Sequence, residues 1–396
     1  MVRRLLMWYN IRMKTVLFIT FSSKYRNRDR LDGVCRYIKE HRLNWRVHVA
    51  EFGDAAPNVT DIVKLWHPIG CIVESGGGTL LRFPGEFADS TPIVYLDGNP
   101  NLCDGDNTLC VLSDSNVIAV AAAKELLLLN RGAYAFVGYR DGSVWWSRER
   151  CRAYESALEL HGKKCVACPE LSQSYAERLQ QLGEWLSAFS SPIAVFAAND
   201  DAAAEVSDAA VKVGLKVPDD VALIGVDDDV EVCERTHPSI SSVRPDFEMA
   251  GYMCAEWIDR KVQGKDACRG VHRFGILYVA HRESTRKKGF TDRRVTLAIE
   301  LIRKRADEGI GVSEVASAMG CSRRFAEVLF ARHTERTILQ ELTESRLEKA
   351  KHLLGRRDVP IGEIARKCGW SSPATLRRAF AERYGKSPRE WRKSLA

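Results

Sequence analysis

The segment VSEVASAMGCS at residues 312–322 recurs 49 positions later as IGEIARKCGWS at residues 361–371. Glutamate, alanine, glycine and serine coincide in the two copies. In each copy a short helix is expected to end at the glycine, which adopts positive φ without strain, and a second helix follows the serine. Ala316 and Ala365 are small enough to let the two helices of a copy cross closely. The pattern predicts two helix-turn-helix motifs, whose second helices can enter a DNA major groove.

The second helix of each motif, at residues 322–332 and 372–383, is basic on the side that its apolar residues leave free. The apolar residues expected to face the interior are Phe325, Leu329, Phe330, Leu376 and Phe380. Arginine can bond guanine through two hydrogen bonds, and further arginines suit phosphates. The residues expected to contact DNA are Ser322, Arg323, Arg324, Glu327, Arg332, Ser372, Pro373, Thr375, Arg377 and Arg378. Two helical hairpins with merely solvated charges remain the alternative.

The charge distribution agrees with this interpretation. Residues 291–396 hold 23 Lys and Arg against 14 Asp and Glu, whereas the rest of the chain has a net charge of −2. Such a division indicates that only the C-terminal region meets a polyanion.

Between the two copies, residues 341–354 predict one amphipathic helix, because apolar side chains recur at helical spacing. Its inward residues are expected to be Leu342, Leu347, Ala350 and Leu354. Such a helix would space the two DNA-facing helices for successive major grooves, roughly 34 Å apart.

The C-terminal segments CGWSS (368–372), RAF (378–380) and YGKSPREWR (384–392) resemble the AraC-type DNA-binding domain. The resemblance implies that Arg324, Glu327, Pro373 and Arg377 approach base edges. The sequence departs from the family at Trp370 and at the Thr375 and Leu376 pair, which leaves the base preference open.

The first 283 residues alternate short apolar runs with helical patterns, which is typical of β-α units on parallel sheets. Ligands of such sheets bind at the carboxyl ends of the strands. The expected strands are residues 15–21, 45–51, 70–74, 92–96, 134–138, 193–198 and 221–226. The expected helices are residues 30–41, 116–129, 147–161, 175–189 and 201–213.

Polar and aromatic side chains follow several of these strands. Carboxylate, amide and guanidinium groups match vicinal hydroxyls, and an indole can stack on the face of a sugar ring. The candidates for effector binding are Trp146, Arg150, Asn199, Asp200 and Asp227. Two other interpretations stay open: Asp200 can be a helix N-cap, and Asp228 and Asp229 can be solvated loop charges.

The segments FAAND (196–200), VGLKVPDDV (213–221), IGVDD (224–228) and PSISSV (238–243) resemble the sensor domain of LacI-type repressors. That family is similar in fold to periplasmic sugar-binding proteins. The resemblance implies two lobes, a hinge and an effector cleft, with an arginine at Arg150 and an aspartate at Asp227 holding the effector. The union of this sensor with an AraC-type domain resembles regulators of xylose operons, which implies xylose as the first candidate effector. The loops after strands 15–21 and 70–74 would then decide the identity of the sugar.

The predicted architecture is therefore an α/β, two-lobed, periplasmic-binding-protein-like sensor with parallel sheets, followed by an all-α domain with two helix-turn-helix motifs. The expected limits are an N-terminal extension at 1–13, the sensor at 14–283, a linker at 284–292 and the DNA-binding domain at 293–396. Translation can begin at Met1 or at Met13. We expect a cytoplasmic protein without membrane contact, because no apolar run approaches about 18–20 residues and no cleavage site follows the start.

Signatures of enzymes and of metal sites are missing from the sequence. It has no GxSxG, Walker A or GxGxxG motif, and the glycines at 76–78 lack the lysine and serine of a P-loop. Twelve cysteines are scattered, and only Cys165 and Cys168 form a CxxC. We expect reduced thiols, no metal, no cofactor and no catalytic residue.

These observations predict a sugar-responsive transcriptional regulator, more an activator than a repressor. Its expected partners are double-stranded operator DNA, a small sugar, RNA polymerase and a second copy of the chain. The alternatives are another sugar, a polyol or a purine as effector, or no effector at all. A sugar-modifying enzyme fused to a DNA-binding domain is disfavoured, because no paired acid and base is expected at the strand ends.

Overall fold

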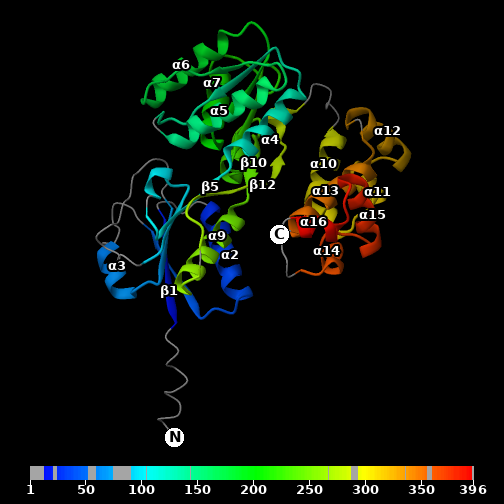
Figure 1. Ribbon diagram of the computed structural model, residues 1–396. Helices are drawn as coiled ribbons and strands as arrows, with labels where there is room; N and C mark the ends of the chain where they lie inside the picture. Colours follow the sequence, from blue (N-terminus) through cyan, green and yellow to red (C-terminus); the bar gives the residue numbers. More distant parts are fainter. Residues whose placement is uncertain are drawn as a thin grey trace. The chain divides into compact units, whose positions relative to one another are not determined.

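The chain forms two compact units, Met1–Thr285 and Arg286–Ala396 (Figure 1). The computed structural model describes residues 13–20, 25–51, 59–74, 91–103, 105–142, 144–265, 267–286, 293–334, 336–354 and 359–394. The predicted extension before Met13, the glycines at 76–78 and residues 287–292 of the predicted linker lie outside this part of the chain.

Lobe 1 of the first unit is built on a six-stranded sheet with the order β11-β5-β4-β3-β1-β2, in which all neighbours are parallel. Its strands are β1 (Lys14–Thr20), β2 (Trp45–Glu51), β3 (Gly70–Glu74), β4 (Ile93–Leu96), β5 (Thr108–Ser113) and β11 (Gly270–Phe274). The central strands read as continuous apolar runs because both faces of the sheet are covered. Helices α2 (Tyr25–Glu40) and α9 (Phe247–Val262) lie side by side on one face, and α3 (Val59–Trp66) packs on the other (Figure 1).

Lobe 2 repeats this plan with the order β12-β10-β9-β8-β6-β7, where only β12 is antiparallel to its neighbour. Its strands are β6 (Ala133–Val137), β7 (Cys165–Ala167), β8 (Ile193–Ala197), β9 (Val221–Val226), β10 (Ser241–Pro245) and β12 (Ile276–Ala280). One face is covered by α4 (Ser115–Leu127) and α5 (Trp145–Glu159). The other is covered by α6 (Tyr175–Ser187), α7 (Asp200–Lys212) and the short α8 (Val230–Arg235).

Three segments carry the chain from one lobe to the other, at Asp114, Asp246 and Gly275. They are hydrogen-bonded to one another: Asp114 N donates to Phe274 O at 2.9 Å, and Asp246 N donates to Gly275 O at 3.0 Å. Both aspartates also cap the helices that follow them, α4 and α9. The lobes therefore meet at a hinge of three crossing segments, in which the segment at residues 274–275 is hydrogen-bonded to each of the other two.

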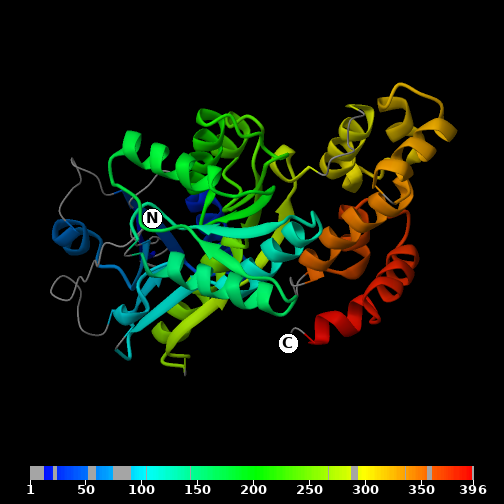
Figure 2. The ribbon, with the colours of Figure 1, turned by 90° about the horizontal axis from the view of Figure 1, so that it is seen from above.

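The second unit consists of helices and turns in the part that the structure describes (Figures 1 and 2). The helices are α10 (Arg293–Arg305), α11 (Val312–Ala318), α12 (Arg323–Thr334), α13 (Ile338–Leu354), α14 (Ile361–Lys367), α15 (Pro373–Tyr384) and α16 (Pro388–Ser394). They surround two cores, and α13 belongs to both, since Leu342 is buried in the first and Leu347, Ala350 and Leu354 in the second. The amphipathic helix predicted between the two copies is confirmed with its inward residues.

The strands expected from the sequence are all present, each within one residue of its expected bounds. The helices expected in the sensor are also present, although α2 begins five residues earlier, at Tyr25 rather than at 30. The sequence did not predict β5, β7, β10, β11 or β12. Residues 238–243, quoted above for their resemblance to the LacI-type sensor, include the first part of β10, which pairs with β9 before the chain crosses to lobe 1.

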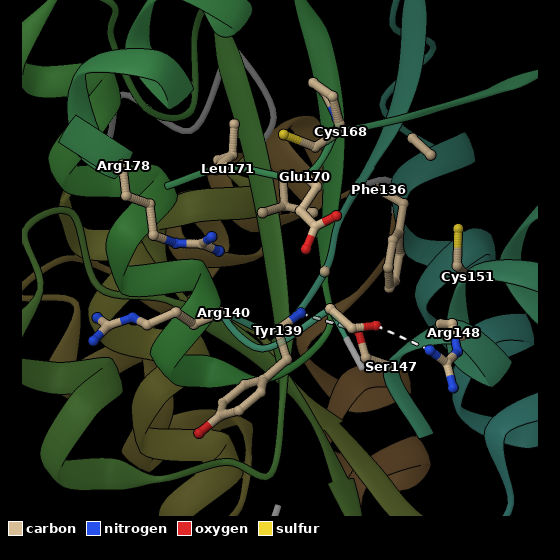
Figure 3. Close-up of a pocket in the computed structure, with 15 residues that line it drawn as sticks. Phe136, Tyr139, Arg140, Ser147, Arg148, Cys151, Cys168, Glu170, Leu171 and Arg178 are labelled. Atoms are coloured by element: carbon tan, nitrogen blue, oxygen red, sulfur yellow. Dashed lines mark hydrogen bonds between the residues drawn. The ribbon is translucent and has the colours of Figure 1, made fainter. Parts of the chain in front are cut away.

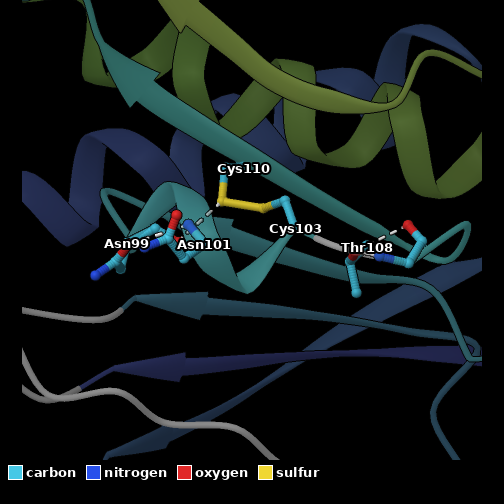
Figure 4. The surroundings of a disulfide bond; sticks show 6 residues. Asn99, Asn101, Cys103, Thr108 and Cys110 are labelled. Carbon is cyan, nitrogen blue, oxygen red and sulfur yellow. Dashed lines mark hydrogen bonds between the residues drawn. A yellow bond between two sulfur atoms is a disulfide. The ribbon is translucent and has the colours of Figure 1, made fainter.

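One expectation about cysteines is wrong. Cys103 and Cys110 form a disulfide that joins the end of the short helix η2 (Pro100–Leu102) to β5 (Figure 4). Cys165 and Cys168 are free thiols, as expected, and burial raises the pKa of each to about 12, so both stay protonated at neutral pH.

Candidate functional site

The carboxyl ends of β8 and β9 bring together Asn199, Asp200 and Asp227, which are 6%, 1% and 8% exposed. Asn199, not Asp200, caps α7, because its side-chain oxygen accepts from Ala202 N at 3.0 Å. The interpretation of Asp200 as the N-cap is therefore wrong. Asp227 has a φ of 109°. Apart from glycine, asparagine and aspartate, residues rarely adopt positive φ.

Asp200 is held by donors from two neighbouring elements. Its carboxylate accepts from Ser242 Oγ at 2.6 Å and from Asp229 N at 2.7 Å. Burial, and then the charge of Asp227, raise the pKa of Asp200 well above its usual value. Two acidic groups thus lie close together at the strand ends, where the sequence predicted no such pair.

Asp228 and Asp229 are not solvated loop charges, as one interpretation of the sequence had them, because they are only 4% and 8% exposed. Asp228 forms an ion pair with Arg282 at 2.8 Å and accepts from the Tyr278 hydroxyl at 3.0 Å. The loop after β9 is therefore tied to the segment that leaves the sensor.

Arg150 and Trp146, both on α5, complete the cluster in lobe 2. The Arg150 guanidinium lies 4.8 Å from the centre of the Trp146 ring and donates to Ala198 O at 2.5 Å. It also donates to Ser113 Oγ at 3.2 Å, across the hinge at the end of β5. The structure thus brings all five predicted effector residues to one edge of lobe 2, with Arg150 reaching lobe 1.

Lobe 1 contributes a buried polar network that the sequence did not predict. The Arg30 guanidinium forms ion pairs with Glu74, at 2.9 Å, and with Asp97. Asn27 donates to Glu74 at 2.9 Å and to Thr20 Oγ1 at 2.6 Å. Three of these residues lie at or directly after a strand end: Thr20 at β1, Glu74 at β3 and Asp97 after β4. Because ligands bind at the carboxyl ends of parallel strands, this position could have identified them from the sequence.

Side-chain contacts connect the lobes beyond the hinge backbone, among them the ion pair between Arg273 on β11 and Glu149 on α5 at 2.6 Å. Ser113 N donates to Asp97 Oδ1 at 3.2 Å, which places Ser113 between the lobe 1 network and Arg150. Arg244 on β10 forms an ion pair with Asp29 on α2 and donates to the carbonyl oxygens of Asp227 and Asp228, each at 3.2 Å. The loop that carries Asp227 is therefore bonded to a residue that holds both lobes.

A separate pocket of about 240 Å³ opens at the ends of β6 and β7 (Figure 3). It is lined by Arg140 and Arg178 on one side and by Arg148 and Cys151 on the other. Glu205 bonds both arginines of the first pair, lying 2.6 Å from Arg178 and also paired with Arg140. None of the five predicted effector residues is among those that line this pocket.

The described residues contain no group of three His, Cys, Asp or Glu side chains that could hold a metal ion. Within that same part of the chain, no helix is long and apolar enough to cross a membrane.

In the second unit both predicted motifs are formed, by α11 with α12 and by α14 with α15. Gly320 and Gly369 have φ values of 65° and 72°, and Ala316 and Ala365 are 2% and 1% exposed. The turns differ in length, however. Ser322 caps α12, whereas the cap of α15 is Ser372 and not Ser371, which is the serine that the repeat aligns with Ser322.

The exposed faces of α12 and α15 carry most of the remaining predicted DNA contacts, whereas Thr375 is half-buried and its hydroxyl donates to Ser372 O at 2.7 Å. Arg323 forms an exposed ion pair with Glu327 at 3.3 Å, and Arg377 Nε donates to Pro373 O at 3.2 Å. The exposed members of the predicted set include Arg324, Arg332 and Arg378. Phe330, Leu376 and Phe380 are buried as predicted, and Leu329 is half-buried. Phe325 is 45% exposed, so its predicted inward position is wrong; Ala326 occupies the buried position instead.

Comparisons with known proteins agree with this architecture. Residues 127–285 match a periplasmic binding protein-like domain, and residues 315–394 match a helix-turn-helix domain. The chain is a transcriptional regulator that joins a sensor of periplasmic-binding-protein fold to a DNA-binding helix-turn-helix domain, and not an enzyme.

Its relatives include xylose operon regulatory proteins. It is 24% identical to that of Escherichia coli K12 over 377 residues, covering 94% of this chain and 95% of the relative. It is 26% identical to that of Haemophilus influenzae over 378 residues, covering 94% and 96%. The solved structure of a xylose-binding transcription activator matches 96% of this chain and 98% of its own, with a TM-score of 0.58 and 23% identity. A transcriptional regulator in complex with cellobiose matches 72% of this chain and 89% of its own, with a TM-score of 0.54 and 19% identity.

Proposed function

We propose that this regulator responds to a small sugar, with xylose as the first candidate. The observation that carries the proposal is the cluster of Trp146, Arg150, Asn199 and Asp227 at the strand ends of lobe 2. An indole, a guanidinium, an amide and a carboxylate supply the stacking face, donors and acceptors that a sugar requires. The similarity to xylose operon regulatory proteins supports xylose over another sugar, a polyol or a purine.

In the proposed complex the sugar lies between the lobes. Trp146 stacks on the ring, while Arg150, Asn199 and Asp227 bond its hydroxyls. Asp200 does not contact the sugar but positions the residues that do. Its oxygens accept hydrogen bonds from Ser242 and from the backbone of Asp229, which fixes the loop after β9. The lobe 1 network around Arg30 and Glu74 forms the opposite wall.

The sugar can switch the protein only through a higher affinity for one arrangement of the lobes than for another. In our proposal the effector domain at 14–283 mediates a homodimer, and the linker at 284–292 passes the change to the DNA-binding domain at 293–396. The two DNA-binding domains then engage two half-sites of an operator beside RNA polymerase, which activates transcription.

Thermal unfolding of the full chain with pentoses, hexoses, polyols and purines tests the effector. A sugar present at about a hundred times its Kd should stabilise the sensor by about 2.7 kcal/mol and raise Tm by about 5 °C. A shift with a purine alone would reject the sugar.

Two variants test the residues of the cluster. Asp227→Ala and Arg150→Ala should abolish the shift, because each removes charged hydrogen bonds of about 1.5–3 kcal/mol apiece to the sugar. Asp208→Asn, at an exposed carboxylate on α7, is the matched control and should keep it. An unchanged sugar affinity in both alanine variants would place the effector elsewhere.

A further inference from the structure

The two DNA-facing helices share one framework when residues are counted from their capping serines. Ser322 Oγ accepts from Phe325 N, and Ser372 Oγ accepts from Thr375 N, in each case three residues later. The residues four and eight positions after each cap have no exposed surface: Ala326 and Phe330 in α12, Leu376 and Phe380 in α15. The sequence repeat has an offset of 49 positions. The offset between structurally equivalent positions of α12 and α15 is therefore one residue larger.

This register places unlike residues at equivalent positions outside the core. Val328 of α12 corresponds to Arg378 of α15, and Glu327 corresponds to Arg377. Three positions after the cap, Phe325 of α12 corresponds to Thr375. Phe325 and Val328 are 45% and 61% exposed and lie three residues apart, so they share one face of α12.

Cations surround this apolar pair. Arg323 and Arg324 precede it on the same helix, and the Arg294 guanidinium of α10 lies 5.2 Å from the centre of the Phe325 ring. An apolar surface enclosed by arginines matches the floor of a major groove between two phosphate strands better than an apolar protein partner. In the major groove, thymine is the base that presents a methyl group, and apolar side chains contact it, whereas arginine bonds guanine.

We infer that α12 reads thymine through Phe325 and Val328, whereas α15 reads guanine through Arg377 and Arg378. This inference rests on the proposed function as a DNA-binding regulator. Each half-site then contains two unlike elements, and the order of the thymine and guanine elements fixes the direction in which the domain lies on DNA. Glu327, paired with Arg323, adds an acceptor for the amino group of a cytosine beside the thymine.

The test uses the full-length chain and a duplex selected from randomised DNA. Replacing thymine by deoxyuridine, one position at a time, removes only the methyl group. We expect roughly fourfold weaker binding at a thymine contacted by α12, the value for one buried methyl group. The double variant Phe325→Ser/Val328→Ser should bind the thymine and deoxyuridine duplexes equally, because neither apolar side chain is left to contact the methyl group. The double variant Arg377→Ala/Arg378→Ala should keep the thymine preference and lose that for guanine.

The matched control is Leu339→Ala, which removes an apolar side chain 58% exposed on α13 and should keep the preference for thymine. Sequence-specific binding that ignores methyl removal, or that keeps its thymine preference in Phe325→Ser/Val328→Ser, overturns the inference while leaving the proposed function intact. A loss of dimerisation or activation in Phe325→Ser/Val328→Ser, with the thymine preference unchanged, would assign the patch to a protein and also overturn it. If no duplex is selected over random DNA, the proposed function itself fails.

Discussion

Arg30 and Glu74 form a buried ion pair in lobe 1, with side chains 1% and 4% exposed. Removing one partner of such a pair leaves a charge in the interior, which costs about 3–5 kcal/mol. We therefore expect Arg30→Ala to lower the free energy of unfolding of the sensor by that amount in urea titrations. Arg269→Ala breaks the exposed pair with Asp106 and should cost less than about 1 kcal/mol. Similar losses of unfolding free energy in Arg30→Ala and Arg269→Ala would show that the hydrogen bonds from Thr20 and Asn27 are enough to stabilise the buried Glu74 carboxylate.

Asp200 should make the sensor lose stability as the pH rises. Burial and the charge of Asp227 raise its pKa in the folded state, so the folded protein keeps a proton that the unfolded chain releases near pH 3.9. Its contribution is full below that pH and falls as the pH rises toward the higher folded-state pKa. The urea midpoint of the wild type should therefore fall relative to that of Asp200→Asn between pH 5 and pH 7. A constant difference would mean that Asp200 is ionised in the fold.

The two helix-turn-helix motifs share a turn glycine with positive φ but differ in the atoms that surround it. Both turn glycines have positive φ, which costs other residues roughly 1–2 kcal/mol. A Cβ on Gly320 would meet nothing within 4 Å, whereas on Gly369 it would lie 2.5 Å from Ala306 O and 2.7 Å from Gly309 N. We expect Gly320→Ala to cost about 1 kcal/mol in thermal unfolding of the second unit and Gly369→Ala at least about 3 kcal/mol. Equal costs would contradict this tight packing around the second turn.

The pattern of apolar residues predicted the strands and helices whose burial can be inferred from their own sequence. Buried strands such as β3 and β9 are continuous apolar runs, so their bounds followed from composition alone. By contrast, β11 has the alternating sequence GVHRF and joins the lobe 1 sheet only because the chain returns through the hinge after α9. No local pattern encodes that return.

The residues of the candidate site also divide into those predictable from the local sequence and those brought together only by the fold. Strand-end residues such as Asn199 and Asp227 lie where the sequence predicted them. Arg30, however, lies on a helix face and meets Glu74 44 positions away, a pairing that only the assembled sheet creates. The exposed position of Phe325 does not follow from apolar spacing, because the small Ala326 takes the core-facing position of α12.

The proposed switch requires a physical route from the effector to the linker. Asp228 follows the effector candidate Asp227 and forms an ion pair with Arg282 at 2.8 Å. Three residues further on, the Thr285 hydroxyl lies 2.6 Å from that of Ser241, which fastens the end of the first unit to β10. A displacement of the loop after β9 would therefore pull directly on the segment that leads into the DNA-binding unit.

Asp228→Asn should separate sugar binding from the response to sugar. The amide cannot hold Arg282 by charge, yet Asp227 stays in place through its backbone hydrogen bond to Val243 O at 2.9 Å. We expect the sugar affinity to change by less than about threefold, since no group that contacts the sugar is lost. The footprint on the operator should become the same with and without sugar. Glu234→Gln removes the other, 56% exposed partner of Arg282 and should leave the sugar-dependent change of the footprint intact. A normal response in Asp228→Asn would exclude this ion pair as the route, because the linker would then follow the effector without it.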